Sequence, residues 1–299
     1  MTFQYFIRRL TKKYLTWLPD AMYLRLLYFG ETGKKLHLKH PRTFNEKIQW
    51  LKLHDRNDRH TEMVDKYAVK EFVSKIIGTD YIFPSIGVWD AFDDIDFSSL
   101  PNQFVLKTTH GGGSGGVVIC KDKSTFDIEN ARRKIENSLK SDIYTSYREW
   151  PYKNVRKRII AEKYFEDENG ELRDYKFFCM NGEPKFMFMA SGRMKEDALT
   201  FDFLDMDYKW IPVRNGHPNS KTLPQKPQNF DTMVALARKL SQGEVFVRVD
   251  LYNIRGKIYF GEYTFFHNSG CVLFEPDEWD KRFGEMIKLP TSNICKSGN

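Results

Sequence analysis

Residues 107–116 read Lys-Thr-Thr-His-Gly-Gly-Gly-Ser-Gly-Gly, and this stretch bears most strongly on the fold. It lies between two short runs, residues 104–107 and 117–120, whose β-branched and aromatic residues predict strands. Six small residues in a row allow backbone N–H groups to approach a chain of phosphates closely. The stretch therefore predicts a polyphosphate-binding loop between two strands. Its structural alternative is a hairpin tip that binds nothing.

The order of these residues argues against three familiar nucleotide-binding motifs. A Walker A lysine follows its glycines and a helix follows the loop, whereas Lys107 precedes the glycines and residues 117–120 read as a strand. The same strand argues against the dinucleotide fingerprint, which Gly111, Gly113 and Gly116 otherwise satisfy. The spacing also matches the glycine-rich loop of protein kinases, but the chain contains neither an HRD nor a DFG tripeptide.

A second hairpin is predicted nearer the C-terminus. Two alternating runs, residues 246–252 and 257–264, flank the turn sequence Asn-Ile-Arg-Gly at 253–256. Asn at the first position and Gly at the fourth position suit a type I turn that is followed by a glycine in the left-handed conformation. Such a turn makes a three-residue loop. In that register Asn253 faces Lys257.

This register aims two carboxylates at one face of the hairpin. Asp250 is expected opposite Phe260 and Arg248 opposite Glu262, so that Asp250 and Glu262 are diagonal neighbours about 7–8 Å apart. Two such carboxylates, together with substrate phosphates, supply the hard oxygen ligands that Mg²⁺ prefers. A register shifted by one residue would separate them. The structural alternative is an ion pair between Arg248 and Glu262 on a solvated face.

The composition is that of a globular protein. With 299 residues, of which 41% are hydrophobic, the chain can form two domains or one large composite domain. No run approaches the roughly 18 apolar residues of a membrane-spanning helix. The cysteines are far apart and form no CxxC pair, which predicts reduced thiols in a cytoplasmic protein and neither a zinc site nor a disulfide framework. They are Cys120, Cys179, Cys271 and Cys295.

Positive charge is concentrated at the N-terminus. Residues 1–60 hold 13 Lys and Arg against five Asp and Glu, a charge of +8, although the whole chain carries only +7. Aromatic residues interleave the first 30 positions. The segment is expected to be a solvated helical face. Its alternative is an amphipathic helix through which residues 1–30 contact the inner face of a membrane, while nucleic acid is not an expected partner.

Three parts and an α+β fold are expected. Residues 1–77 read as helices, interrupted at 18–20 and 30–41, with a helix cap at 43–46. Residues 78–165 and 166–299 read as two lobes in which strands alternate with helices. Further strands are expected at 159–165 and 176–180, and further helices at 127–139 and 231–241.

Four segments occur in an order that resembles the ATP-grasp superfamily. They are Asp65-Lys66 followed by Lys70, Lys107 with the glycine loop, residues 162–165, and Asp250 with residues 262–264. More narrowly, residues 43–52 and 258–262 resemble the TupA-like branch, which is found with bacterial surface-polysaccharide and teichuronopeptide synthesis. The resemblance extends from about residue 41 to 270. It implies two αβ lobes that sandwich a nucleotide.

The resemblance assigns ATP to particular residues of this chain. Lys107 would contact the α- and β-phosphates, and Lys66 would be the earlier nucleotide lysine. Glu162 and the backbone around Tyr164 would meet the adenine, and Asp174 would bind the ribose. The loop expected to close over the β- and γ-phosphates consists of Gly111, Gly112, Gly113, Ser114, Gly115 and Gly116.

The resemblance also implies Mg²⁺ held by Asp250 and Glu262. Thr264 occupies a second metal position at which many ATP-grasp enzymes carry Asn. This departure replaces an amide oxygen with a hydroxyl. One of two metals is therefore expected to be held more weakly.

In the implied reaction, ATP phosphorylates a carboxylate and an amine then displaces phosphate from the acyl-phosphate. The product would join an amino acid or another amine to a carboxylate of a bacterial surface polysaccharide or its precursor. Arg248 would grip the acyl-phosphate or the carboxylate, because a guanidinium matches two oxygens, and Lys176 is assigned to the same catalytic group. His110 would transfer a proton, or would be a loop histidine bonded to backbone. Residues 267–270 would border the acceptor.

A metal-dependent glycosyltransferase is the main rival. Asp205-Met206-Asp207 has the DxD spacing that can bind a metal and a sugar nucleotide. However, residues 201–210 read as strand, turn, strand, which favours acids that serve the turn. A third possibility is a basic binding module for nucleic acid or membrane.

Overall fold

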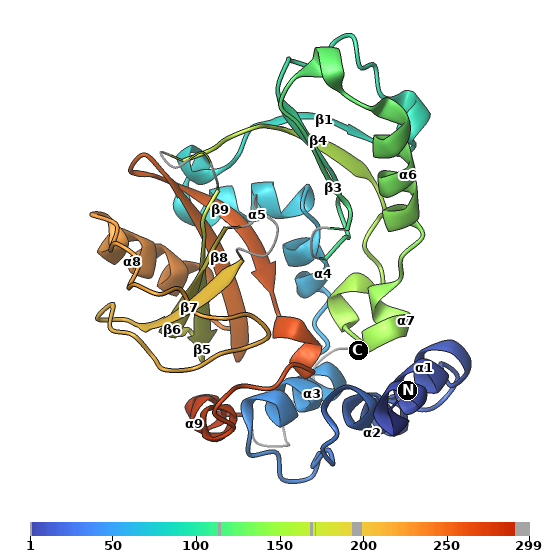
Figure 1. Ribbon diagram of the computed structural model, residues 1–299, viewed down its shortest axis with the longest axis vertical. Helices are drawn as coiled ribbons and strands as arrows, with labels where there is room; N and C mark the ends of the chain where they lie inside the picture. Colours follow the sequence, from blue (N-terminus) through green and yellow to red (C-terminus); the bar gives the residue numbers. More distant parts are fainter. Residues whose placement is uncertain (1, 113–114, 168–169, 171, 193–198, 291–299) are drawn as a thin grey trace.

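The computed structural model describes residues 2–112, 115–167, 170, 172–192 and 199–290. Within them the chain forms two antiparallel sheets surrounded by helices, which is the expected α+β class (Figure 1). Gly113 and Ser114 of the predicted phosphate loop, and Cys295, lie outside the described residues.

The first sheet carries the glycine loop. Its strands, in spatial order, are β1 (Ser85–Trp89), β4 (Ile159–Lys163), β2 (Phe104–Thr108) and β3 (Val117–Cys120). Helix α6 (Ile128–Leu139), capped by Asp127, packs on β2 and β3. The core between them includes Phe104, Leu106 and Ile135. The loop at 109–116 therefore joins two antiparallel strands, as the sequence predicts.

The second sheet is larger and carries the predicted carboxylates. Its strands, in spatial order, are β7 (Thr200–Asp205), β6 (Glu183–Ser191), β5 (Asp174–Met180), β8 (Phe246–Ile254) and β9 (Lys257–Thr264). Helix α8 (Phe230–Leu240) packs on β5, β6 and β8. Figure 1 shows the two sheets on different sides of the helices α4 and α5.

Five helices precede the first sheet. They are α1 (Phe3–Tyr14), α2 (Asp20–Thr32), α3 (Phe44–His54), α4 (Arg59–Val64) and α5 (Ala68–Ile77). The interruption before α2 falls at Pro19 and the next begins at Gly33, whose left-handed conformation ends α2. Thr43 and Glu46 form the expected capping box of α3.

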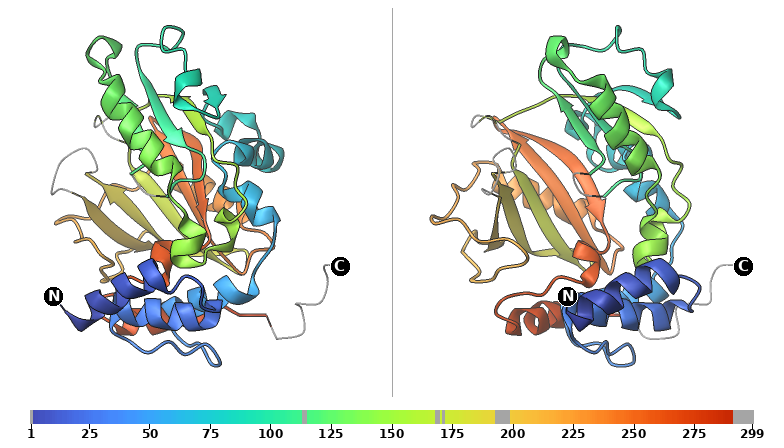
Figure 2. Two further views of the ribbon diagram at one scale, coloured as in Figure 1. Left: turned by 90° about the vertical axis from the view of Figure 1, so that its right-hand side faces the viewer. Right: turned by 45° about the vertical axis from the view of Figure 1, so that its right-hand side comes forward.

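These helices belong to more than one packing cluster. Helix α2 forms a small cluster with Leu36 and Leu38. In contrast, α3, α4 and α5 contribute side chains such as Phe44 and Val69 to the hydrophobic core of the second sheet. Figure 2 shows α1 and α2 together at one end of the molecule. The remaining α-helices of the described ranges are α7 (Ile143–Tyr147) and α9 (Glu278–Met286). No helix of the described ranges is both long enough and apolar enough to cross a membrane.

The turn between β8 and β9 differs from the prediction. Ile254 pairs with Lys257, so the loop holds only Arg255 and Gly256, both with positive φ (51° and 82°). Two such residues are typical of a type I′ hairpin turn. The predicted three-residue loop, with Asn253 facing Lys257, is therefore wrong. Asn253 pairs with Ile258, and its side-chain oxygen accepts a hydrogen bond from Gly256 N (3.1 Å).

A bulge at Gly261 restores the predicted grouping of the carboxylates. Leu251 pairs with Phe260, but the next residue, Asp250, pairs with Glu262, because Gly261 is an extra residue in β9. Asp250 and Glu262 are thus direct partners on one face, not diagonal neighbours. A Cβ at position 261 would lie 2.8 Å from Tyr252 Cε2 and 3.1 Å from Asp250 O. The absence of a side chain at this position allows the bulge.

The Gly261→Ala substitution is expected to lower the free energy of unfolding by about 1–3 kcal/mol, because the added Cβ must displace its neighbours. Chemical denaturation monitored by circular dichroism would measure the change. Gly112→Ala is a matched control, since its Cβ would lie at an ordinary 3.5 Å from Ile143 Cδ1. Equal stability of the two variants would contradict this account of the bulge.

Candidate active site

A row of three charged side chains crosses the second sheet. Lys176 on β5, Asp250 on β8 and Glu262 on β9 are direct partners on adjacent strands. Directly opposite residues point to the same face, so strand register alone brings the three together. Asp250, at the centre, is completely buried, and Lys176 Nζ contacts its Oδ2.

Arg248 gives Asp250 a second cationic partner. It lies two residues earlier on β8, and its Nε and Nη2 donate to the two carboxylate oxygens of Asp250, each at 2.7 Å. This is a bidentate pair of the kind that guanidinium geometry favours. Burial by itself lowers the pKa of Arg248, but the adjacent Asp250 outweighs burial and raises it. Two cations are therefore fixed at one place on the sheet.

Glu262 connects this group to the glycine loop through Lys66. Its Oε2 lies 3.3 Å from Lys66 Nζ, and its Oε1 lies 3.6 Å from Arg248 Nη2. Lys66 Nζ also donates to the carbonyl oxygen of Gly111 at 2.6 Å. Burial opposes ionisation of Glu262, but Lys66, Lys176 and Arg248 together lower its pKa. A single lysine thus joins elements of both sheets.

A second cationic group lies on the first sheet, around Glu162. Lys107 Nζ contacts Glu162 Oε2 at 2.5 Å, and Lys70 Nζ contacts Oε1 at 2.6 Å. Burial raises the pKa of Glu162, but the two lysines outweigh burial and lower it to about 2. Lys70 belongs to the motif that carries the family resemblance but has no predicted role; it lies four residues after Lys66, in the first turn of α5.

The base of the glycine loop is closely packed at two of its glycines. Thr108 and Ser138 share a hydrogen bond of 2.7 Å beneath the loop. A Cβ on Gly111 would lie 2.4 Å from Thr108 Oγ1, and a Cβ on Gly116 would lie 2.2 Å from Ser138 Oγ. A Cβ on Gly115, in contrast, would meet no heavy atom of the described residues within 4 Å. Close packing therefore accounts for the glycines at positions 111 and 116.

His267 contacts the guanidinium of Arg248 and fixes its orientation. Its Nδ1 lies 2.8 Å from Arg248 Nη1, and its Nε2 lies 2.9 Å from Asn215 Oδ1. Asn215 Nδ2 donates to the carbonyl oxygens of Val272 and Leu273, which fixes the amide orientation. Burial, followed by Arg248 and Lys176, places the pKa of His267 well below its ordinary value. The neutral ring therefore accepts from Arg248 at Nδ1 and donates from Nε2.

Helix α3 supports the loop that holds His267. Gln49 Nε2 donates to the carbonyl oxygens of Ser269 (2.7 Å) and Gly270 (3.0 Å), and Lys52 Nζ donates to Ser269 at 2.8 Å. Asn268, Ser269 and Gly270 all have positive φ, a conformation that needs such support. The sequence 43–52 therefore serves the site through this loop.

Two other predicted residues have local partners. His110 is buried, and its Nε2 lies 3.2 Å from the carbonyl oxygen of Ser138, which matches the structural alternative. Burial and Lys157 lower the pKa of His110. The Tyr164 hydroxyl donates to Glu166 at 2.8 Å. Neither contact brings these side chains into the charged row.

Asp174 and Thr264 lie beside the row. The carboxylate of Asp174 is buried and 3.6 Å from Lys176 Nζ. The Thr264 hydroxyl accepts a hydrogen bond from Arg248 Nη2 at 2.9 Å. Thr264, predicted as a metal ligand, thus belongs to the hydrogen-bond network of Arg248 in this structure.

The residues present fit Mg²⁺ with one condition. Glu262 and Asp250 are hard oxygen ligands on one face, and the Glu262 side chain is about one-third exposed (34%). The carboxylate oxygens of Asp250 already accept hydrogen bonds from Arg248 and Lys176. A metal ion can bind these oxygens only if one of the two cations moves away. No group of three or more His, Cys, Asp or Glu side chains capable of holding a metal occurs in the described ranges. Further ligands must therefore come from phosphates or water.

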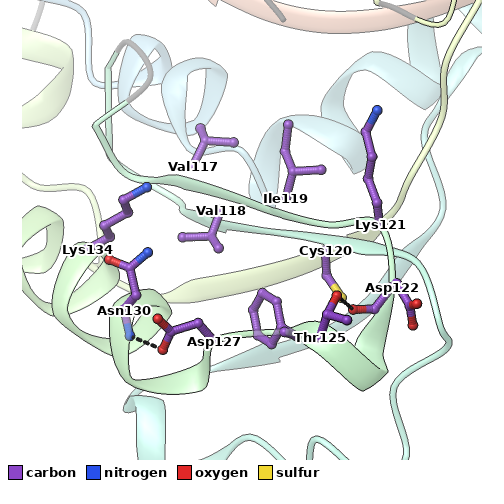
Figure 3. A pocket seen from close by; sticks show the side chains of 11 residues that line it. Val117, Val118, Ile119, Cys120, Lys121, Asp122, Thr125, Asp127, Asn130 and Lys134 are labelled. Carbon is purple, nitrogen blue, oxygen red and sulfur yellow. Dashed lines mark hydrogen bonds between the residues drawn. The ribbon is translucent and has the colours of Figure 1, made fainter.

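The remaining candidates lie outside this site. The hollow of about 510 Å³ in Figure 3 is lined by β3 and the start of α6, and contains none of the predicted site residues. Asp205, of the DxD sequence, accepts hydrogen bonds from the backbone N–H groups of Asp207 (3.0 Å) and Lys209 (2.8 Å). These acids therefore form the turn that the sequence favours.

Comparison with known proteins identifies the family. The TupA-like ATP-grasp family matches residues 46–288, which is most of the chain. The chain therefore belongs to the TupA-like ATP-grasp family, as its motifs predict, and ATP-grasp proteins are a class of ATP-dependent ligases. A comparison with curated proteins finds no match.

Three solved structures are similar to this chain at low sequence identity. An ADP complex of N5-carboxyaminoimidazole ribonucleotide synthetase has 17% sequence identity and a TM-score of 0.45. The matched region covers 74% of this chain and 50% of the synthetase chain. D-Alanine-D-alanine ligase from Helicobacter pylori has 12% identity, a TM-score of 0.44, and coverages of 83% and 69%. D-Cycloserine synthetase has 15% identity, a TM-score of 0.41, and coverages of 77% and 72%. The chain spans about half the length of the first of these structures.

Mg-ATP is expected to raise the unfolding temperature, because a ligand of the native state stabilises that state. Lys107→Met and Glu262→Gln should each greatly reduce this shift by removing a phosphate partner and a metal ligand. Thermal unfolding with and without Mg-ATP would measure it. Lys185→Met, on the exposed part of β6, is the control that keeps the full shift. An undiminished shift in both site variants would place the nucleotide elsewhere.

The ion pairs of Glu162 predict a particular pH dependence of stability. Its pKa is about 2 in the folded protein against an ordinary 4.5, so its stabilisation is complete above pH 4.5 and is lost as the pH falls through 2. Glu162→Gln should therefore be less stable than wild type at pH 7, and the difference should shrink between pH 4.5 and 2.

Denaturant unfolding across this pH range would test the prediction. Glu71→Gln removes an exposed ion pair with Lys75 and should change stability little at any pH. A difference between wild type and Glu162→Gln that stays constant down to pH 2 would show that the charge of Glu162 does not stabilise the fold.

Proposed function

We propose that this chain is a carboxylate–amine ligase that uses ATP through an acyl-phosphate and releases ADP and phosphate. Its substrates would be a carboxylate of a bacterial surface polysaccharide or its precursor, and an amino acid or another amine. The family assignment supports the ATP-dependent ligation. The TupA-like branch, through its association with surface-polysaccharide synthesis, supports the substrate class.

The observation that carries the proposal is the number of cationic side chains that contact the carboxylates of the two sheets. Five cationic side chains meet four carboxylates in this region, which gives a formal excess of one positive charge. The cations are Lys66, Lys70, Lys107, Lys176 and Arg248, and the carboxylates are Glu162, Asp174, Asp250 and Glu262. An anionic nucleotide suits such a region, because the lysines can exchange carboxylate oxygens for phosphate oxygens.

The positions of these groups suggest separate tasks. Lys107 and Lys66 lie nearest the glycine loop and would hold the phosphates that remain on ADP. Lys176 and Arg248 would face the transferred phosphoryl group, where their positive charge offsets the charge that develops in the transition state. Mg²⁺ bound at Glu262 and Asp250 would supply further charge neutralisation and orient the phosphates.

The chemistry has two steps. A carboxylate oxygen of the acceptor attacks the γ-phosphorus, and the bond from this phosphorus to ADP breaks. The amine nitrogen then attacks the acyl carbon, phosphate leaves, and the nitrogen loses a proton. Arg248 is suited to both steps, because its guanidinium can hold two oxygens of the carboxylate or of the acyl-phosphate. His267 keeps the guanidinium in place.

A carboxylate–amine screen tests this function. With ATP, Mg²⁺, uronic acids or glutamyl peptides, and a set of amino acids, the protein is expected to release ADP and phosphate and to form an amide detectable by mass spectrometry. Arg248→Lys should lower kcat by at least about tenfold, since a lysine loses the bidentate contact. Release of AMP and pyrophosphate would contradict the acyl-phosphate mechanism, and a response to sugar nucleotides alone would favour the glycosyltransferase.

A further inference from the structure

Helix α1 packs against the protein through its polar side. Arg8 Nη1 lies 3.3 Å from Glu31 Oε2, and Lys12 Nζ contacts Glu31 Oε1 and the Tyr147 hydroxyl, both at 2.7 Å. Thr11 is completely buried. A Cβ on Gly30 of α2 would lie 2.7 Å from Arg8 N, so this glycine allows the two helices to approach closely on that side.

The apolar side of the same helix faces outward. Positions 3, 6, 10 and 14 recur at helical spacing and share one face. Phe3, Phe6 and Tyr14 on this face are 68%, 52% and 58% exposed, and Trp17 in the following turn is 75% exposed. A surface helix ordinarily buries its apolar stripe and exposes its polar one. Helix α1 instead exposes much of its apolar stripe, although Phe3 packs edge-on against Phe29 of α2 (ring centroids 6.3 Å apart) and Leu10 is partly buried.

The charge beside this face is positive. The first acidic residue of the chain is Asp20, whereas Arg8, Arg9, Lys12 and Lys13 all lie in α1. Arg9 and Lys13 are exposed and form no ion pair within the part of the chain that the structure describes. Figures 1 and 2 place α1 and α2 at one end of the molecule, beyond the two sheets.

We propose that the exposed face of α1, with Trp17, binds the surface of a membrane that contains anionic lipids. Aromatic residues that enter the acyl boundary, with cations beside them at the level of the phosphate groups, are the features of a helix that lies in a membrane interface. A second copy of this chain fits less well, because a two-fold contact would bring the like charges of Arg9 and Lys13 together. This inference does not depend on the ligase activity.

Flotation of the full chain with lipid vesicles tests the proposal. We expect binding to phosphatidylcholine vesicles that contain about one third phosphatidylglycerol, with much weaker binding to phosphatidylcholine alone and in high salt. Phe6→Ser with Trp17→Ser should weaken binding at least about tenfold, by removing apolar contact. Arg9→Glu with Lys13→Glu should weaken it by a similar or larger factor, by reversing the local charge.

Matched variants on other faces control for general effects. Leu223→Ser removes an exposed apolar residue outside α1, and Lys185→Glu with Lys239→Glu makes the same charge change on β6 and α8. These variants should bind vesicles as wild type does, and thermal unfolding would confirm that all variants are folded. The proposal is overturned if the α1 variants bind as the controls do. Loss of a dimer in the α1 variants, seen by light scattering without vesicle binding, would assign the face to self-association.

Discussion

The carboxylate of Asp250 is the group on which the arrangement of the site depends. It is completely buried and held by Arg248 and Lys176, and a buried charge is tolerated only with such partners. Removal of one partner from a buried ion pair costs about 3–5 kcal/mol, so the two cations and the carboxylate hold each other in place. Strand register sets this group, because Lys176 and Glu262 flank Asp250 on adjacent strands. The same register therefore fixes the positions of both cations on one face of the sheet.

A second layer of contacts joins helix α3 to Arg248. Gln49 and Lys52 of α3 hold the loop at residues 267–271, whose backbone is left-handed at three successive positions. That loop presents His267 to Arg248, and Asn215 fixes the ring from the other side. The chain of contacts thus runs from α3, through the loop at residues 267–271, to the guanidinium of Arg248.

Local sequence patterns predict much of the fold, but they predict only part of the candidate site. The strands around the glycine loop, the cap of α3 and the helix at 127–139 depend on neighbouring residues, which is why their patterns predict them. The register of the β8–β9 hairpin does not, because it depends on the bulge at Gly261, where a Cβ would lie close to Tyr252 and Asp250. The pairing of Lys70 with Glu162 joins residues far apart in sequence. No spacing rule reveals such a contact.

The central claim is that the cations between the two sheets bind the phosphates of ATP. A crystal structure of the chain with Mg²⁺ and a non-hydrolysable ATP analogue tests it most directly. The account predicts phosphate oxygens within hydrogen-bond distance of Lys66, Lys107 and Arg248, with the metal on Glu262. A nucleotide bound in the hollow between β3 and α6, with the ion pairs of Lys107 and Asp250 unchanged, would contradict it.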